Sequence, residues 1–320
     1  MSLTSQVVAS CLIIPALIAG IFAWATGWFA RRVRSKNSDG SDPARPNDAK
    51  ASNGLETAGG IIAEIGWCMA MMAAMGMRQW VGSETGLVET IVGVESWQRT
   101  IWPMMLFGIV LSIGAATQPD RGASRYALAG LTAALAAFMT LPSGENWSDQ
   151  LPLHRSWSGL MVASCLANAW ALESLVRQRG DRWCLLVLLA GFATPAMLTA
   201  LNYAAPAEWV LASIAATVGA TGVIAWQASR GAPSAAWMVV FPGCVVIASM
   251  TMTARFYTYE DYPRWVYSIA LFLPAMIRFI DLPIQSRSWR LRVPVAALVA
   301  IGLMLACANE LILSEPTENW

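Results

Sequence analysis

Length, composition and charge place this chain in a lipid environment. It has 320 residues, of which 56% are hydrophobic and only 13% are charged, and its net charge is +1. Soluble domains carry about 25% charged residues, so a chain this poor in charge cannot cover a water-facing surface. The balanced charge also offers no basic surface for nucleic acid, which excludes that class of partner.

Ten apolar runs predict an all-α polytopic membrane protein, a bundle of about ten transmembrane helices. About 20 residues at 1.5 Å rise per residue cross a hydrocarbon core about 30 Å thick. In chain order the runs are 7–29, 58–77, 101–117, 126–142, 157–175, 183–204, 209–228, 236–254, 265–284 and 293–312. The chain therefore divides into a first span at 1–29, a polar segment at 30–57 and a nine-span membrane domain at 58–320.

The first run is predicted to stay in the mature protein as a membrane span. It lacks the basic n-region of a signal peptide, and the stop-transfer-like flank Arg31-Arg32-Val33-Arg34 follows it. The segment 30–57 is rich in Gly, Pro, Ser and Asn and is predicted to be a flexible cytoplasmic linker. Residues 84–97 can form a short amphipathic helix, which we expect on the outer membrane surface.

The distribution of basic residues sets the predicted orientation. With the N-terminus outside, the inner loops carry 15 of the Lys and Arg residues and the outer loops carry five. Cytoplasmic loops are enriched in these residues, so both termini are predicted on the outer side. Arg outnumbers Lys by 19 to 2, a bias associated with GC-rich bacterial genomes. The predicted location is therefore a bacterial inner (plasma) membrane.

The chemistry-bearing residues exclude several kinds of site. Each of the six cysteines lies in an apolar run, and none is within four residues of another, which excludes a disulfide framework and a zinc cluster. The one histidine, His154, cannot provide bis-histidine haem ligation or an H-E-x-x-H zinc site. The sequence contains neither a phosphate-binding loop nor a dinucleotide fingerprint. We expect no metal and no cofactor.

Four ionisable residues lie within or at the ends of predicted spans on the cytoplasmic side. Each costs about 2.5–3.5 kcal/mol on insertion scales, so it is a candidate functional residue. Glu64 in the second run and Arg278 in the ninth lie at matching depths, and Asp281 follows Arg278 by one helical turn. Glu173 lies nearer a span end. These residues predict a charged transport site or proton relay; the alternative is structural ion pairing between spans or snorkelling.

Other polar residues define two further candidate groups. Amide and acidic side chains deeper in the spans can bond neighbouring helices or line a solute path, and these are Asn168, Asn202, Asn309 and Glu310. Residues in predicted outer loops could hold a metal or activate an acceptor, as in polyprenyl-linked glycosyltransferases, and these are Glu260, Asp261 and His154. The alternative for the second group is an ordinary solvated, interfacial loop.

These features favour a secondary transporter or permease for a small solute or ion, embedded in the bilayer and not an enzyme. One alternative is a subunit or scaffold of a membrane complex, bound to a membrane protein partner or to copies of itself. The other is a membrane-embedded transferase that acts on a lipid-linked substrate. Five plus five spans would permit an inverted repeat, a common transporter design, but the prolines and polar motifs of the two halves match poorly.

Overall fold

In the computed structural model, the described part of the chain is built of helices. The described residues are 8–38, 65–73, 98–117, 122–142, 151–179, 181–200, 204–228, 237–257 and 262–282, together with 298, 301, 302 and 305. No β-strand occurs in these ranges. The elements are a π-turn Ala9–Ile13, α2 Ile14–Ser38, a 3₁₀ turn Gln98–Thr100, α5 Ile101–Thr117, α6 Gly122–Thr140, α7 Leu151–Arg179, α8 Asp181–Ala200, α9 Ala204–Ala228, α10 Trp237–Tyr257 and α11 Arg264–Asp281.

Helical segments overlap the first nine predicted runs, including a helical stretch at 65–73 inside the second. Within the described residues, three stretches are long and apolar enough to cross a membrane: Arg155–Gln178, Trp183–Ala200 and Val240–Tyr257. Shorter apolar helical stretches cover Ala9–Ala25 and Ile101–Leu111. The tenth run and the surface helix at 84–97 lie outside the described residues, apart from the four isolated positions.

Two helices extend beyond the predicted runs. Helix α2 continues to Ser38, so the helix extends into the segment predicted to be a flexible linker. Helix α7 begins at Leu151, which places His154 in the first turn of a helix rather than in a loop. Pro152 is the second residue of α7, and proline is well tolerated in a first helical turn because the N–H it lacks would have no intrahelical partner there.

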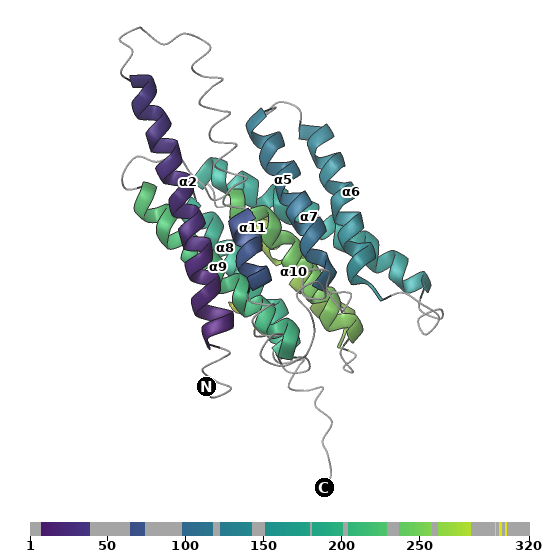
Figure 1. The fold of residues 1–320 in the computed structure, drawn as a ribbon. Coiled ribbons are helices and arrows are strands. Elements are labelled where there is room, and N and C mark those ends of the chain that lie inside the picture. The colour runs from purple at the N-terminus through teal and green to yellow at the C-terminus, as the bar shows by residue number, and fades with distance from the viewer. Residues whose placement is uncertain are drawn as a thin grey trace.

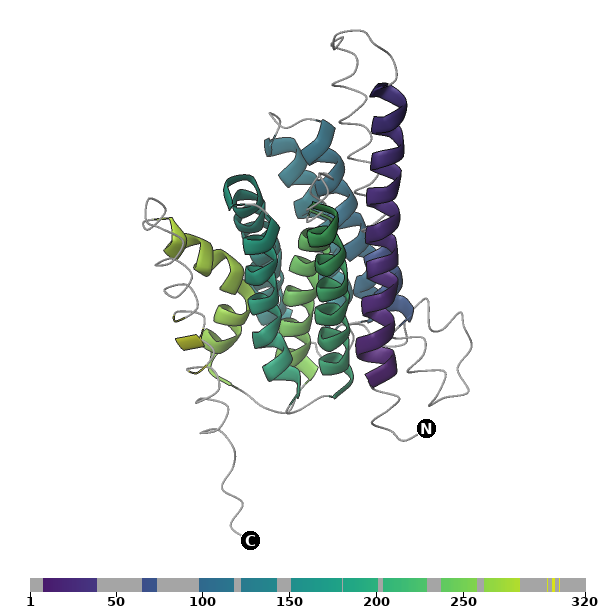
Figure 2. The ribbon, with the colours of Figure 1, turned by 90° about the vertical axis from the view of Figure 1, so that its left-hand side faces the viewer.

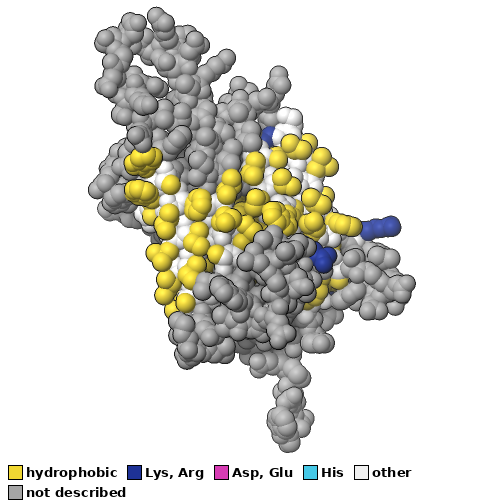
Figure 3. Space-filling view, viewed as in Figure 1, with side chains coloured by type: hydrophobic (Ala, Val, Ile, Leu, Met, Phe, Trp, Pro, Cys, Tyr) yellow, Lys and Arg dark blue, Asp and Glu magenta, His cyan; other side chains and the backbone are white. Residues whose placement is uncertain are grey.

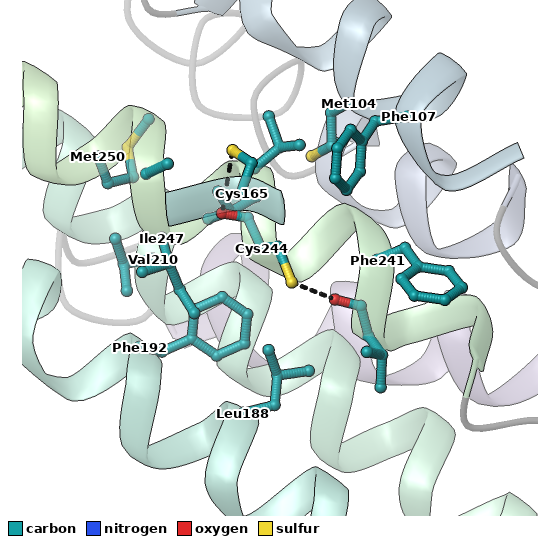
Figure 4. Close-up of a cluster of buried hydrophobic side chains, with 14 of the residues drawn as sticks. Met104, Phe107, Cys165, Leu188, Phe192, Val210, Phe241, Cys244, Ile247 and Met250 are labelled. Atoms are coloured by element: carbon teal, nitrogen blue, oxygen red, sulfur yellow. Dashed lines mark hydrogen bonds between the residues drawn. The ribbon is translucent and has the colours of Figure 1, made fainter. Parts of the chain in front are cut away.

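Helix α10 lies at the centre of the bundle (Figures 1 and 2). It packs against α5, α6, α7, α8, α9 and α11, and every residue from 240 to 254 is buried. A helix that is apolar all round is expected in such a position. Figure 4 shows part of the resulting core, where Phe241, Cys244 and Ile247 of α10 meet side chains of α5, α7, α8 and α9.

Contacts between distant helices show their relative directions. Ala16 of α2 meets Gly219 of α9, and Gly20 meets both Gly219 and Val223, so α2 and α9 run in the same direction. Likewise Asn168 and then Ser174 of α7 contact successive parts of α11, so these two helices are also parallel. The predicted ten-run topology gives the same relative direction to each of these pairs.

The contact between α2 and α9 depends on glycine. A Cβ added at Gly219 would lie 2.2 Å from the carbonyl oxygen of Ala16, which is backbone and cannot rotate away. Small residues permit such a close approach between membrane helices, where van der Waals packing drives association. Gly219 therefore fixes the first helix of the chain to the rest of the bundle.

The outer surface of the described bundle is apolar. On the face in Figure 3, hydrophobic side chains form a broad area, and arginines lie only at its margins. On α6, Leu131 is 68% exposed and Phe138 is 76% exposed. A surface of this kind is suited to lipid rather than to water.

Candidate functional site

Charged and polar side chains of three helices gather at one end of the bundle, where α6 begins and α7 and α11 end. They form two clusters on opposite sides of the last turns of α7. The Glu173 cluster comprises Arg125, Tyr126, Glu173 and Arg177. The Arg278 cluster comprises Ser174, Gln178, Arg278 and Asp281.

In the Glu173 cluster, one carboxylate accepts hydrogen bonds from three side chains. Arg125 donates through Nη2 to both carboxylate oxygens, Tyr126 donates its hydroxyl, and Arg177 donates through Nη2 at 2.6 Å. The side chains of Arg125 and Glu173 are each 6% exposed, whereas that of Arg177 is 48% exposed. The ion pair that joins α6 to α7 is therefore the buried one, and Arg177 covers it from the surface.

In the Arg278 cluster, one guanidinium joins α11 to α7. Its Nη1 donates to Asp281 Oδ2 at 3.0 Å, one turn along the same helix. Its Nε donates to Ser174 Oγ at 2.6 Å and its Nη2 to Gln178 Oε1 at 2.7 Å. Arg278 is 1% exposed and Asp281 is fully buried. Breaking such a buried pair by removing one charge is strongly destabilising.

The sequence of α7 explains why two clusters form side by side. Residues four apart share a helical face, so Glu173 lies with Arg177 and Ser174 lies with Gln178. Adjacent residues in a helix point about 100° apart. The first pair therefore faces α6 and the second faces α11. Together the two clusters contain three arginines and two carboxylates, which leaves the clusters with one net positive charge.

Deeper in the bundle, the Asn168 side chain is inserted into the backbone of α11. Its Nδ2 donates to the carbonyl oxygen of Leu271 at 2.8 Å, and its Oδ1 accepts from the N–H of Ala275 at 3.1 Å. In a regular helix that N–H and that carbonyl are partners of each other. Pro274 lies between them and has no N–H to donate, which disturbs the helix here. The bend of α11 is visible at the left of Figure 2.

Prolines also interrupt the two neighbouring helices, α8 at Pro195 and α10 at Pro242. Pro195 cannot donate to the carbonyl of Gly191, and the Thr194 hydroxyl lies 3.4 Å from that carbonyl oxygen. A Cβ at Gly191 would lie 2.8 Å from the ring of Pro274. The three interrupted helices therefore pack against one another, and two of the prolines lie close to the same glycine.

Aromatic side chains occupy the opposite end of the bundle. Trp157 lies edge-to-face with both Phe256 and Tyr267, at centroid distances of 6.3 and 6.1 Å. The Arg255 guanidinium lies 5.5 Å from the centroid of Tyr267. All three rings are buried, so this is a packed aromatic cluster that joins the start of α7 and α11 to the end of α10.

The described residues bring together four of the predicted site residues: Glu173 and Asn168 on α7, with Arg278 and Asp281 on α11. Glu64, which the sequence predicts as the partner of Arg278, lies outside the described residues. So do the candidates Asn202, Asn309, Glu310, Glu260 and Asp261, and the side chain of His154. Among the described side chains, the interhelical partners of Arg278 are the uncharged Ser174 and Gln178.

The sequence singles out neither Arg125 nor Arg177, because both lie outside the predicted runs 126–142 and 157–175. The polar members Tyr126, Ser174 and Gln178 are not singled out by the sequence either. Helix α6 begins at Gly122, earlier than predicted, which brings Arg125 into its first turn and against α7. The neighbouring Tyr126 is a polar side chain at the same predicted span end. An arginine followed by a tyrosine at the end of a span is the sequence feature that could have indicated this part of the site.

Within the described ranges, no group of three or more His, Cys, Asp or Glu side chains could hold a metal ion. The five cysteines described there are buried and not disulfide-bonded. Comparison of the chain with models of protein families, with curated proteins and with solved structures finds no match. Function is therefore argued from the arrangement of these residues.

Proposed function

We propose that this chain is a ten-span protein of a bacterial inner membrane that transports a small solute or ion. Both termini lie on the outer side and the clusters around Glu173 and Arg278 lie on the cytoplasmic side. Support comes from three helices apolar enough to cross a membrane, from the apolar outer surface and from the paired charges held inside.

The observation that carries the proposal is the insertion of Asn168 into α11. A membrane helix tolerates an interrupted ladder only where neighbouring groups satisfy the released backbone atoms. The Asn168 amide does this for Leu271 and Ala275 from another helix. Helix α11 is continuous from Arg264 to Asp281 but contains Pro274, and transporters commonly have proline-containing broken helices near their substrate sites.

The residues of α11 before and after Pro274 have different contacts. The part after Pro274 carries Arg278 and Asp281, whose charges are the proposed transport site. The part before it packs through Tyr267 against Trp157 at the other end of the bundle. In this proposal, release of the Asn168 contacts lets the charged part of α11 move relative to α7, which is a hinge motion of the kind that alternating access requires.

Thermal unfolding of the detergent-purified protein against ions, sugars, amino acids, lipids and polyprenyl phosphates tests this function. A ligand that binds the folded state stabilises it by RT ln(1 + [L]/Kd), about 2.7 kcal/mol at a hundredfold excess over Kd. We expect one class of small solute or ion to raise the unfolding temperature, and Arg278→Lys to weaken that response.

Other outcomes would favour the alternative functions. A response to polyprenyl phosphates that is lost in Glu260→Gln or Asp261→Asn, but kept in Arg278→Lys, would indicate a transferase. A folded protein that responds to nothing in the panel, and that co-purifies with a stable partner, would indicate a subunit or scaffold of a membrane complex.

A further inference from the structure

The last part of α2 extends beyond α9, the helix on which α2 packs. Gly20 of α2 lies against Val223 of α9, and the two helices run in the same direction. Ala228, the last residue of α9, follows Val223 by five residues and is therefore level with Ala25 of α2. Residues 26–38 continue as helix beyond that level, for about 20 Å. Figures 1 and 2 show this end of α2 projecting past α9.

One face of α2 is apolar and exposed up to the start of this extension. Its members follow one another at intervals of three or four residues, so they form a stripe along the helix. They are between 45% and 61% exposed, and they are Leu17, Ile21, Trp24 and Trp28. Ala19 and Ala23, on another face, are buried in the bundle. In a membrane protein such a stripe faces lipid, and tryptophan at the end of a span is enriched at the headgroup level.

The extension carries all the charge of α2. Its basic residues are Arg31, Arg32, Arg34 and Lys36, and α2 contains no Asp or Glu. A bilayer is about 40–45 Å thick with its headgroups and about 30 Å thick without them, which leaves about 5–8 Å for each headgroup layer. At about 1.5 Å per residue, positions 31 and 32 come about 5–6 Å after Trp28. With Trp28 at the inner edge of the headgroup layer, both positions fall within that layer.

Helical geometry also places positions 31 and 32 on the lipid-facing side of α2. Since successive residues are about 100° apart, each of these positions lies about 50° from the mean direction of the apolar stripe, one on either side. Positions 34 and 36 lie about 90–110° from that direction and about 9–12 Å beyond Trp28. Two of the four basic positions are therefore aligned with lipid headgroups in both depth and direction, and the other two are not.

We propose that the end of α2 binds the headgroups of anionic phospholipids through Arg31 and Arg32. An extension with four basic and no acidic residues is complementary to an anionic membrane surface, which attracts basic residues next to a membrane span. The apolar stripe that leads into it favours lipid over an acidic protein or nucleic acid, because Trp24 and Trp28 are exposed there and hold these positions at the bilayer. The proposal rests on the membrane location of α2 and does not require that the chain transports a solute.

Native mass spectrometry of the full-length protein, released from detergent micelles, tests the site by counting bound lipids. Phosphatidylglycerol is titrated into the micelles, with zwitterionic phosphatidylcholine as the comparison. We expect wild type to bind phosphatidylglycerol at least about tenfold more tightly than phosphatidylcholine. Arg31→Gln combined with Arg32→Gln should weaken the apparent Kd for phosphatidylglycerol about 30-fold, because each basic residue at an anionic surface contributes about fivefold.

The matched control is Arg34→Gln combined with Lys36→Gln, which removes the same number of charges from the same end of α2. Both positions lie off the stripe and farther from Trp28, so this variant should weaken the apparent Kd about threefold at most. Equal weakening by the two double variants would overturn the proposal in favour of diffuse attraction to the whole basic segment. Affinity for phosphatidylglycerol that neither variant changes would place the lipid elsewhere on the bundle and refute the site.

Two further outcomes would also overturn the proposal. The first is equal affinity of wild type for the two lipids. The second is nucleic acid or an acidic protein that co-purifies with wild type and is lost in the first double variant, without any preference for phosphatidylglycerol, since that result would assign the end of α2 to a different partner.

If the first double variant does not fold, the single variants Arg31→Gln and Arg32→Gln replace it, and each should weaken the apparent Kd about fivefold. Both positions lie beyond the level at which α9 ends, so the unfolding temperature without added lipid should equal that of wild type. Single variants that fold and bind phosphatidylglycerol as wild type does would refute the site.

Discussion

The Asn168 contacts with α11 are expected to contribute measurably to folding stability. Asn168→Ala removes two hydrogen bonds, to the Leu271 carbonyl at 2.8 Å and from the Ala275 N–H at 3.1 Å. Hydrogen bonds between membrane helices average about 0.6 kcal/mol and reach about 1.7 kcal/mol. Two of them at one buried side chain give an expected loss of about 1–2 kcal/mol in the free energy of unfolding, plus a small cavity.

The same account predicts that this loss depends on Pro274. Pro274→Ala restores an N–H that can donate to the Ala270 carbonyl, and it removes the ring that disturbs the helix, so the Ala275 N–H can donate to the Leu271 carbonyl. Asn168→Ala should then cost less in the Pro274→Ala background than in wild type. Residues that share a network show coupling energies of about 0.5–3 kcal/mol, and the expected value lies within that range.

Equilibrium denaturation of the purified protein in detergent measures both quantities. The control is Ser164→Ala, because the Ser164 hydroxyl is equally buried in α7 but donates within its own helix to Met161 at 2.8 Å. That change should cost less than about 0.5 kcal/mol, as intrahelical hydroxyl bonds add little. Additive effects of the Asn168 and Pro274 changes would refute the reasoning, as would an equal cost for Ser164→Ala.

Three further predictions concern packing and charge. Gly219→Leu should lower the free energy of unfolding by about 1–3 kcal/mol, because its Cβ meets the backbone of α2; Gly222→Leu, where a Cβ has nothing within 4 Å, should be nearly neutral in the same thermal assay. Arg278→Met should cost about 3–5 kcal/mol in denaturation, because it breaks a buried ion pair with Asp281 by removing one of its charges. Arg177→Gln should cost less than about 1 kcal/mol, since that side chain is 48% exposed. Gly219→Leu is compared with Gly222→Leu, and Arg278→Met with Arg177→Gln. Equal losses of stability within either pair would contradict the difference in packing or burial between its two positions.

Local composition was sufficient to predict most of the helices. Apolar runs of span length mark helices such as α5 and α10 because lipid removes the alternative of hydrogen bonding to water. The boundaries were harder to predict, as α2 and α7 show. Charged or polar ends such as Arg31–Lys36 have helix propensity of their own, so a helix continues past the point where its hydropathy falls.

The partners of the site residues could be predicted only within one helix. The one-turn spacing of Arg278 and Asp281 is visible in the sequence, and the structure places the two side chains in contact. The contact of Arg278 with Ser174 and Gln178 depends on which face of α7 packs on α11, and sequence spacing contains no such information. The same holds for Asn168: its amide predicts a bond to a neighbouring helix, but the choice of α11 at its proline follows from tertiary packing.

The transport function itself is tested most directly by electrical recording from proteoliposomes adsorbed on a solid support. Wild-type protein is exposed in turn to jumps in each solute and ion of the panel, beside Asn168→Ala and Ser164→Ala. The account predicts a transient current for at least one solute, reduced in Asn168→Ala and retained in Ser164→Ala. Uptake of labelled solutes is measured as well, because electroneutral transport gives no current. If folded, reconstituted wild type shows neither current nor uptake with any solute, the proposed transport function is contradicted.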